Sequence, residues 1–201
     1  MDNEAFWDNR SYLRNNARKL NDPVILDFKI WINSFKKPVS ILDVGCGNGI
    51  LSQTICKNNY YTGIDISKKN TSIATEIFYN ERFKWINGDY LYYDFKMLKY
   101  DILVFSYSIF CMDKIASALG KSRLLLKNEG HLVLYTAVDD PEFRRTFYFP
   151  QFYGYKALFS AICTTDIIGL LKEHQFNITS INVLETKKTH IIRIIANPIS
   201  R

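Results

Sequence analysis

The sequence lacks the features of a membrane-spanning, secreted or metal-binding protein. Its longest apolar runs are strand-sized, well short of the roughly 20 residues that a transmembrane helix needs. The polar, acidic start Met1-Asp2-Asn3-Glu4 is unlike a secretory signal. No Cys-x-x-Cys pair and no histidine–cysteine cluster with zinc spacing occurs among the cysteines, which are Cys46, Cys56, Cys111 and Cys163. We therefore expect a cytoplasmic protein with reduced, structural thiols and no bound metal.

Repeats, low-complexity stretches and linkers rich in Pro, Gly or Ser are also absent, so the 201 residues predict a single domain, 1–201. The formal net charge is +6, but it is scattered in doublets such as Lys68-Lys69. Proteins that bind nucleic acid through basic tails have much longer runs. The charge pattern favours a solvated surface, with nucleic acid as a possible but less favoured partner. The small size and the single aromatic insert leave no separate recognition domain and favour a small-molecule substrate. Nothing in the sequence predicts the oligomeric state.

What the sequence does contain is an alternation of strand and helix patterns. β-Branched and apolar runs predict strands at 39–44, 60–65, 83–86, 101–105 and 131–135, with helices at about 50–58, 67–79 and 113–127 between them. An earlier helix begins at Pro23, capped by Asp22, and a late one runs from Thr164 or Thr165 to Glu173.

Two further strands are predicted at 178–184 and 189–196. The link between them is too short for a crossover helix, so they must form an antiparallel hairpin. The predicted fold class is therefore α/β: a three-layer sandwich around a seven-stranded, mostly parallel sheet whose last strand is antiparallel.

A glycine-rich loop, 45–49, follows the first predicted strand and precedes a predicted helix. Its sequence is Gly45-Cys46-Gly47-Asn48-Gly49. Glycines permit a tight turn and leave backbone exposed to a ligand, and open α/β sheets bind ligands beyond the carboxyl ends of their strands. The Gly-x-Gly-x-Gly spacing differs from the Gly-x-Gly-x-x-Gly of dinucleotide dehydrogenases, and no Gly-x-x-x-x-Gly-Lys-Ser/Thr phosphate loop is present.

The loop and four later segments resemble the ordered motifs of class I S-adenosylmethionine-dependent methyltransferases. These segments are 43–49, 63–67, 87–90, 100–105 and 125–134, and the similarity is strong over residues 24–137. In the last of them, Asn128-Glu129-Gly130 replaces the family's Pro-Gly-Gly. The resemblance implies a methyltransferase enzyme with a Rossmann-like fold, S-adenosylmethionine as cofactor and S-adenosylhomocysteine as product.

The resemblance also implies roles for three acidic residues. Asp65 would accept hydrogen bonds from the ribose hydroxyls, Asp89 would accept one from the adenine amino group, and Asp43 would support the loop and the methionine amino group. Without a ligand, the same residues would be a helix cap, a turn residue and a loop support. The cofactor-binding residues implied by the family are Asp43, Gly45, Cys46, Gly47, Gly49, Asp65, Ile66, Asp89, Tyr90, Phe105 and Ser106.

Residues for the methyl acceptor are predicted in two segments and after the fourth strand. The aromatic insert 139–163 is either a substrate cap, with Arg144, Tyr148 and Tyr153 as candidate contacts, or a hydrophobic cover with solvated charges. The N-terminal region 1–37, which includes the candidate contact Tyr12, is either a helical lid or a packed surface helix. Tyr107 is the candidate catalytic residue, because it follows the strand near which the methyl group should lie.

The predicted reaction is methyl transfer to an oxygen or nitrogen of a small-molecule substrate, anionic or aromatic in character. RNA or protein methylation and a non-catalytic partner that binds S-adenosylmethionine are the alternatives. Residues 105–108, Phe-Ser-Tyr-Ser, do not match the Asn/Asp-Pro-Pro-Tyr/Phe sequence of adenine-N6 enzymes. Cys111 has no preceding proline, as the nucleophile of a cytosine-C5 enzyme would have, and is expected to be a core thiol.

Overall fold

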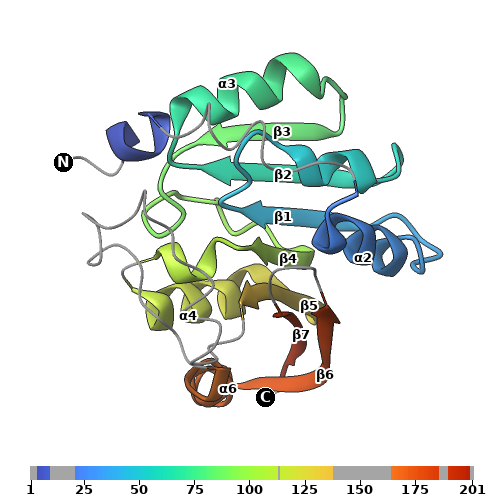
Figure 1. Ribbon diagram of the computed structural model, residues 1–201, viewed down its shortest axis with the longest axis vertical. Helices are drawn as coiled ribbons and strands as arrows, with labels where there is room; N and C mark the ends of the chain where they lie inside the picture. The colour runs from blue at the N-terminus through green and yellow to red at the C-terminus, as the bar shows by residue number, and fades with distance from the viewer. Residues whose placement is uncertain (1–3, 10–20, 113, 138–163, 186–189, 200–201) are drawn as a thin grey trace.

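A computed structural model describes residues 4–9, 21–112, 114–137, 164–185 and 190–199 of the protein. Within them a seven-stranded sheet has the order β3-β2-β1-β4-β5-β7-β6 (Figure 1). The strands are β1 (Ser40–Val44), β2 (Tyr60–Asp65), β3 (Phe83–Asn87), β4 (Tyr100–Ser106), β5 (Leu126–Ala137), β6 (Phe176–Glu185) and β7 (His190–Pro198). Strands β1 to β5 are parallel, and β7 runs antiparallel to both β5 and β6. The predicted α/β fold and its terminal hairpin are confirmed.

Helices cover both faces of this sheet. They are α2 (Pro23–Ile32), α3 (Lys68–Ile77), α4 (Ile115–Leu125) and α6 (Thr164–Glu173), with short 3-10 helices η1 (Ile50–Thr54) and η2 (Ile109–Cys111). The successive residues Ile41 and Leu42 of β1 are both fully buried, in different core clusters. The cluster with Ile41 includes α2 and η1, and the cluster with Leu42 includes α4 and α6. A central strand buried on both faces is the reason for its continuous apolar sequence.

The helix cap predicted at Asp22 is present, and Ser67 caps α3. The carboxylate of Asp22 accepts a hydrogen bond from the Val24 amide (2.9 Å), and Pro23 occupies the first turn of α2. The hydroxyl of Ser67 accepts one from the Asn70 amide (3.1 Å) at the start of α3. Each cap satisfies an amide that the first helical turn cannot pair.

An ion pair fixes α2 against the far strands of the sheet. The guanidinium of Arg193 on β7 donates to both carboxylate oxygens of Asp27, at 2.9 Å each. The hydroxyl of Tyr135 on β5 donates to the same carboxylate (2.7 Å). Both charged side chains are largely buried. The network therefore fixes the position of α2 on β5 and β7.

The prediction of a helix over residues 50–58 is wrong. Only Ile50–Thr54 is helical, and it is a 3-10 helix, after which Ile55 is extended. The chain must return from the end of β1 to the start of β2 along the length of the sheet. A 3-10 helix rises about 2.0 Å per residue against 1.5 Å in an α-helix, so η1 covers more of this distance per residue than an α-helix would.

Two other boundaries differ from the prediction. Helix α4 ends at Leu125, and β5 begins at Leu126, several residues before the predicted start of that strand. A register irregularity between Tyr100 and Ile102 accompanies this early pairing. Among the described residues no helix is both long and apolar enough to cross a membrane.

Candidate functional site

The glycine-rich loop lies at the carboxyl edge of the sheet and is tied to the neighbouring strand. The amides of Gly45 and Cys46 both donate to the carbonyl oxygen of Ile64 on β2, at 2.8 and 3.1 Å. Gly47 and Gly49 have φ of 55° and 79°, in the left-handed region that other residues rarely adopt. A Cβ on Gly49 would collide with the ring of Trp85, whereas one on Gly47 would meet no heavy atom within 4 Å. The loop is therefore packed at Gly49 and open at Gly47.

Asp65, at the end of β2, connects this loop to helix α3. One carboxylate oxygen accepts from the Gly47 amide (2.8 Å) and the other from the Ser67 amide (2.9 Å). The side chain is half-buried and lines a cleft at the sheet edge. Asp65 thus has the helix-start role that sequence reasoning allowed, at the position that a ligand-binding carboxylate would need.

Asp43 lies beneath the loop in a buried polar contact. Its carboxylate accepts a hydrogen bond from the hydroxyl of Tyr61, one of the largest fully buried side chains of the described core. The ring of Tyr61 packs against that of Trp85, with centroids 5.3 Å apart, and Trp85 in turn lies against Gly49. Asp43 is therefore connected to the loop through Tyr61 and Trp85, and its predicted roles toward the loop and the cofactor stay predictions.

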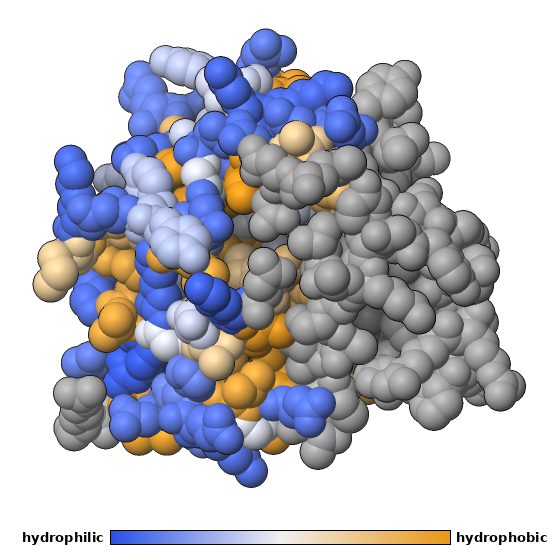
Figure 2. All heavy atoms as spheres, turned by 90° about the vertical axis from the view of Figure 1, so that its left-hand side faces the viewer, coloured by the Kyte–Doolittle hydropathy of each residue, from blue (hydrophilic) through white to orange (hydrophobic). Residues whose placement is uncertain are grey.

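The cleft beside the loop, which we call the edge cleft, has a volume of about 250 Å³. Most of its lining residues lie at or just after the carboxyl ends of β1 to β4. Figure 2 shows the side of the molecule toward which these strands point in Figure 1, and hydrophobic and hydrophilic side chains are mixed over its coloured part. The described residues that line it are Trp7, Gly45, Ile64, Asp65, Ile66, Gly88, Asp89, Tyr90, Leu91, Tyr92, Ser108, Cys111, Met112 and Lys114.

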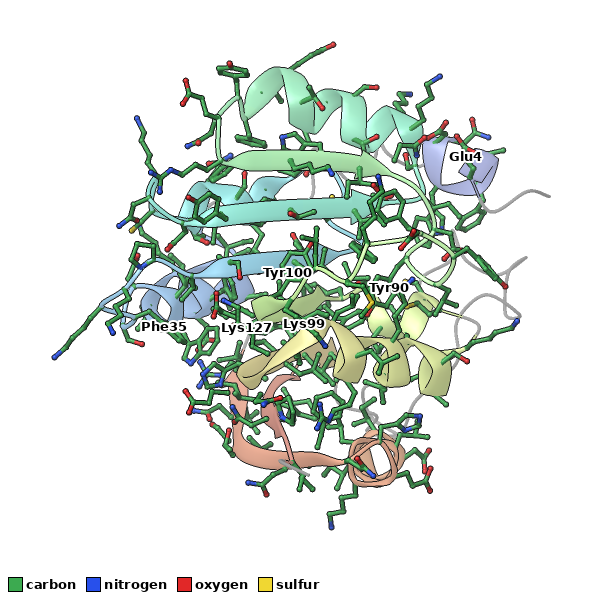
Figure 3. All side chains as sticks on the ribbon, turned by 180° about the vertical axis from the view of Figure 1, so that it is seen from behind. Glu4, Phe35, Tyr90, Lys99, Tyr100 and Lys127 are labelled. Carbon is green, nitrogen blue, oxygen red and sulfur yellow. The ribbon has the colours of Figure 1, made fainter. Side chains whose placement is uncertain are left out.

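The segment after β3 forms one wall of the edge cleft. Asp89 accepts from the Leu91 amide through a side-chain oxygen (2.8 Å), which makes it a turn residue as well as a cleft residue. Tyr90 is almost fully buried, and burial raises the pKa of its hydroxyl. Figure 3 shows Tyr90 beside α4, on the same side of the molecule as the N-terminal helix that carries Glu4.

The structure brings part of the predicted cofactor set to the cleft. Five predicted residues line it: Gly45, Asp65, Ile66, Asp89 and Tyr90. The others lie in or behind the loop or in the core, and they are Asp43, Cys46, Gly47, Gly49, Phe105 and Ser106.

Phe105 and Ser106 occupy buried positions at the end of β4. The Phe105 ring is fully buried and meets the Tyr90 ring edge-on, with centroids 5.7 Å apart. Phe105 therefore supports the cleft wall through Tyr90. A cofactor role for either residue stays a prediction.

Tyr107 follows β4 and has an unusual backbone conformation. Its φ is 63°, and its amide donates to the Tyr135 carbonyl (3.1 Å). A bulky residue in the left-handed region is strained, and such strain is concentrated at functional sites. The side chain is half-buried against the cluster on the α2 face.

A helical segment over residues 4–9 lies near the end of β2 (Figure 1). Its Trp7 lines the edge cleft, while Phe6 is buried. A carboxylate oxygen of Asp8 accepts from the Ser67 hydroxyl (2.6 Å) and the Lys69 amide (3.0 Å). This segment is thus fastened to the start of α3, whereas α2, in the same predicted lid region, packs on the sheet. The lid function stays a prediction.

The cysteines of the site differ in their surroundings. Burial raises the pKa of the Cys46 thiol, and the carboxylates of Asp65 and Asp43 raise it further, so Cys46 is a neutral thiol. The prediction that Cys111 is a core thiol is wrong: it is half-buried and lines the edge cleft, because the chain turns outward in η2 after β4. In the described part of the chain, no group of three His, Cys, Asp or Glu side chains could hold a metal ion.

Sequence reasoning missed several cleft residues. Ser108, Met112 and Lys114 follow β4 without a motif, whereas Trp7 belongs to the predicted lid region 1–37. The sequence feature that could have indicated these three residues is their position after the end of a strand. The predicted acceptor contacts Tyr12, Arg144, Tyr148 and Tyr153, and the insert 139–163, lie outside the described residues.

A mostly parallel α/β sheet with a glycine loop and a carboxylate at adjacent strand ends is typical of proteins that bind nucleotides. A family model described as "Methyltransferase domain" matches residues 41–130. The sequence is 32% identical over 127 residues to a ubiquinone biosynthesis O-methyltransferase of Pelagibacter ubique, and the match covers 59% of this chain and 51% of that protein. The chain thus spans about half the length of this curated relative.

Solved structures share the fold. The 1,6-didemethyltoxoflavin-N1-methyltransferase of Burkholderia thailandensis, with bound 1,6-didemethyltoxoflavin and S-adenosylhomocysteine, superposes with a TM-score of 0.75 at 12% identity, over 98% of this chain and 87% of that one. The [4+2]-cyclase SpnF superposes with a TM-score of 0.71 at 15% identity, over 89% and 81% of the two chains. Residues 41–130 thus match a methyltransferase domain, and the order of strands is that of the class I S-adenosylmethionine-dependent methyltransferase fold.

Proposed function

We propose that the chain binds S-adenosylmethionine in the edge cleft and transfers its methyl group to an oxygen or nitrogen of a small molecule. The observation that carries this proposal is the placement of Asp65. Its carboxylate lies on the cleft wall and accepts a hydrogen bond from the amide of Gly47. The hydrogen bond fixes the carboxylate beside the glycine-rich loop.

The residues present fit this cofactor. An ionised carboxylate has about four acceptor positions on its two oxygens. Asp65 can therefore keep its bonds to Gly47 and Ser67 and still accept from the ribose hydroxyls. Asp89 can likewise keep its hydrogen bond from the Leu91 amide and still accept one from an adenine amino group. Gly47 leaves space for a ligand against the loop.

When bound, S-adenosylmethionine supplies an activated methyl group with its own leaving group. The work left to the chain is to position the acceptor and to exclude water. Trp7 and Met112 give the edge cleft apolar walls for this purpose. Tyr107, held in its strained conformation at the end of β4, is the residue proposed to orient the acceptor or take a proton from it.

The names of similar proteins support a small acceptor. The curated relative is named for O-methylation in ubiquinone biosynthesis, and a structural neighbour for N1-methylation of 1,6-didemethyltoxoflavin. We propose that Tyr12, Arg144, Tyr148 and Tyr153 contact such an acceptor. Replacing Arg144 by alanine should then weaken an anionic acceptor and leave the affinity for the cofactor unchanged, whereas equal loss of both would make this residue structural.

The experiment that tests this function is methyl transfer from labelled S-adenosylmethionine to three separate pools: small metabolites, RNA and protein. Label in the small-molecule pool supports the proposal. Label confined to RNA or protein supports the alternative that the net charge of +6 keeps open. Binding without transfer to any pool would point to a non-catalytic partner, and the cyclase with this fold shows that the fold alone does not guarantee methyl transfer.

A further inference from the structure

Lys121 of α4 reaches the segment between β3 and β4 from behind the edge cleft. Its ammonium donates to the carbonyl oxygens of Leu91 (3.1 Å) and Tyr93 (2.7 Å). One side chain therefore holds two backbone positions of a segment that otherwise has no regular structure. Leu91 is itself a cleft residue.

The same ammonium is enclosed by aromatic rings. It lies 5.4 Å from the ring centroid of Tyr90 and 5.2 Å from that of Phe95, within the range of a cation–π contact. Burial lowers the pKa of Lys121, while the carboxylates of Asp89 and Asp94 act in the opposite direction. The carboxylates and rings that face Lys121 thus all belong to the segment between β3 and β4.

The next residue of α4 holds the same wall by a second contact. The Ser122 hydroxyl donates to the Ala118 carbonyl (2.7 Å) and lies 2.9 Å from the Tyr90 hydroxyl. Because the single proton of Ser122 is already donated, Tyr90 is the donor in that pair. Tyr90 is therefore fixed at its ring and at its hydroxyl by two consecutive residues of one helix.

We propose that Lys121 is a positioning residue for the cofactor, which holds the wall formed by residues 89–92 in the shape that receives the nucleoside end. The proposal rests on the proposed function of the edge cleft. Lys121 does not line the cleft among the described residues and acts through the carbonyl oxygens that it binds. A wall without this clamp would have to be ordered by the ligand, at the expense of affinity.

The test is calorimetric titration of the full chain with S-adenosylhomocysteine and, separately, with adenosine. The variants are Lys121→Met, Lys121→Arg and, as matched control, Lys172→Met at an exposed position of α6. Lys121→Met should raise both dissociation constants by about tenfold, a change of about 1.4 kcal/mol. The number of ligand molecules bound per chain should stay unchanged, because the variant is expected to remain folded and to lose affinity only.

Lys121→Arg should recover part of the affinity, since its guanidinium can also donate to two carbonyl oxygens. The control should bind as the unmutated protein does. Should Lys121→Met not fold, Lys121→Gln replaces it, because its amide nitrogen can still donate hydrogen bonds without carrying a charge. Unchanged dissociation constants in a folded variant would overturn this inference alone, and no binding by the unmutated protein would overturn the proposed function with it.

Discussion

The loop glycines offer a test in which folding and ligand binding respond to different positions. Gly47→Ala and Gly49→Ala both place a Cβ at positive φ, which costs roughly 1–2 kcal/mol. At Gly49 the new atom would also lie 2.8 Å from Trp85 Cζ3, and nearer still to Cη2, and 3.0 Å from the Ala74 Cβ. Such overpacking adds about 1–3 kcal/mol. We therefore expect Gly49→Ala to lose roughly 2–5 kcal/mol and Gly47→Ala only the backbone contribution.

Urea denaturation followed by circular dichroism measures both free energies of unfolding. A loss of 2–5 kcal/mol is large for a domain whose total stability is about 5–15 kcal/mol, so the difference between the variants should be clear. For Gly47→Ala we expect a folded protein with weakened binding of S-adenosylhomocysteine, because its methyl group would occupy the open side of the loop. Equal destabilisation of the two variants would refute the assignment of a packed and an open side.

Three further predictions concern contacts outside the loop. Asp27→Ala leaves Arg193 buried without its carboxylate and should cost about 3–5 kcal/mol in urea denaturation; a cost near zero would mean that the pair is solvated. Asp8→Ala removes the attachment to α3 and should speed hydrogen exchange in residues 4–9, whereas unchanged exchange would show that Phe6 packing alone holds the segment. Burial lowers the pKa of His131, so the unfolded chain binds more protons near the usual histidine pKa and stability should fall as pH drops through that range. His131→Gln should flatten this pH dependence, and an unaltered slope would assign it to other groups.

The core of the site could be predicted because it is encoded locally. A strand of buried residues, the glycine spacing at 45–49 and a carboxylate at the end of the next strand occur in sequence order, and parallel pairing of β1 with β2 brings them together. The terminal hairpin was predictable for a similar reason, since its connection is too short for any other arrangement.

Other features depend on packing between segments far apart in the sequence. Lys121 has no pattern that connects it to Leu91, and the place of Trp7 in the edge cleft depends on the contacts between residues 4–9 and α3. Propensity and periodicity cannot supply such contacts.

Calorimetric titration with S-adenosylhomocysteine, comparing the unmutated chain with Asp65→Ala, tests the central proposal most directly. We expect binding in the micromolar range at about one site per chain, which would be the edge cleft, and a sharp loss in the variant. Thermal unfolding of Asp65→Ala without ligand separates this loss from the effect of its missing bonds to Gly47 and Ser67. No binding by the unmutated protein, or equal binding by a folded variant, would contradict the account.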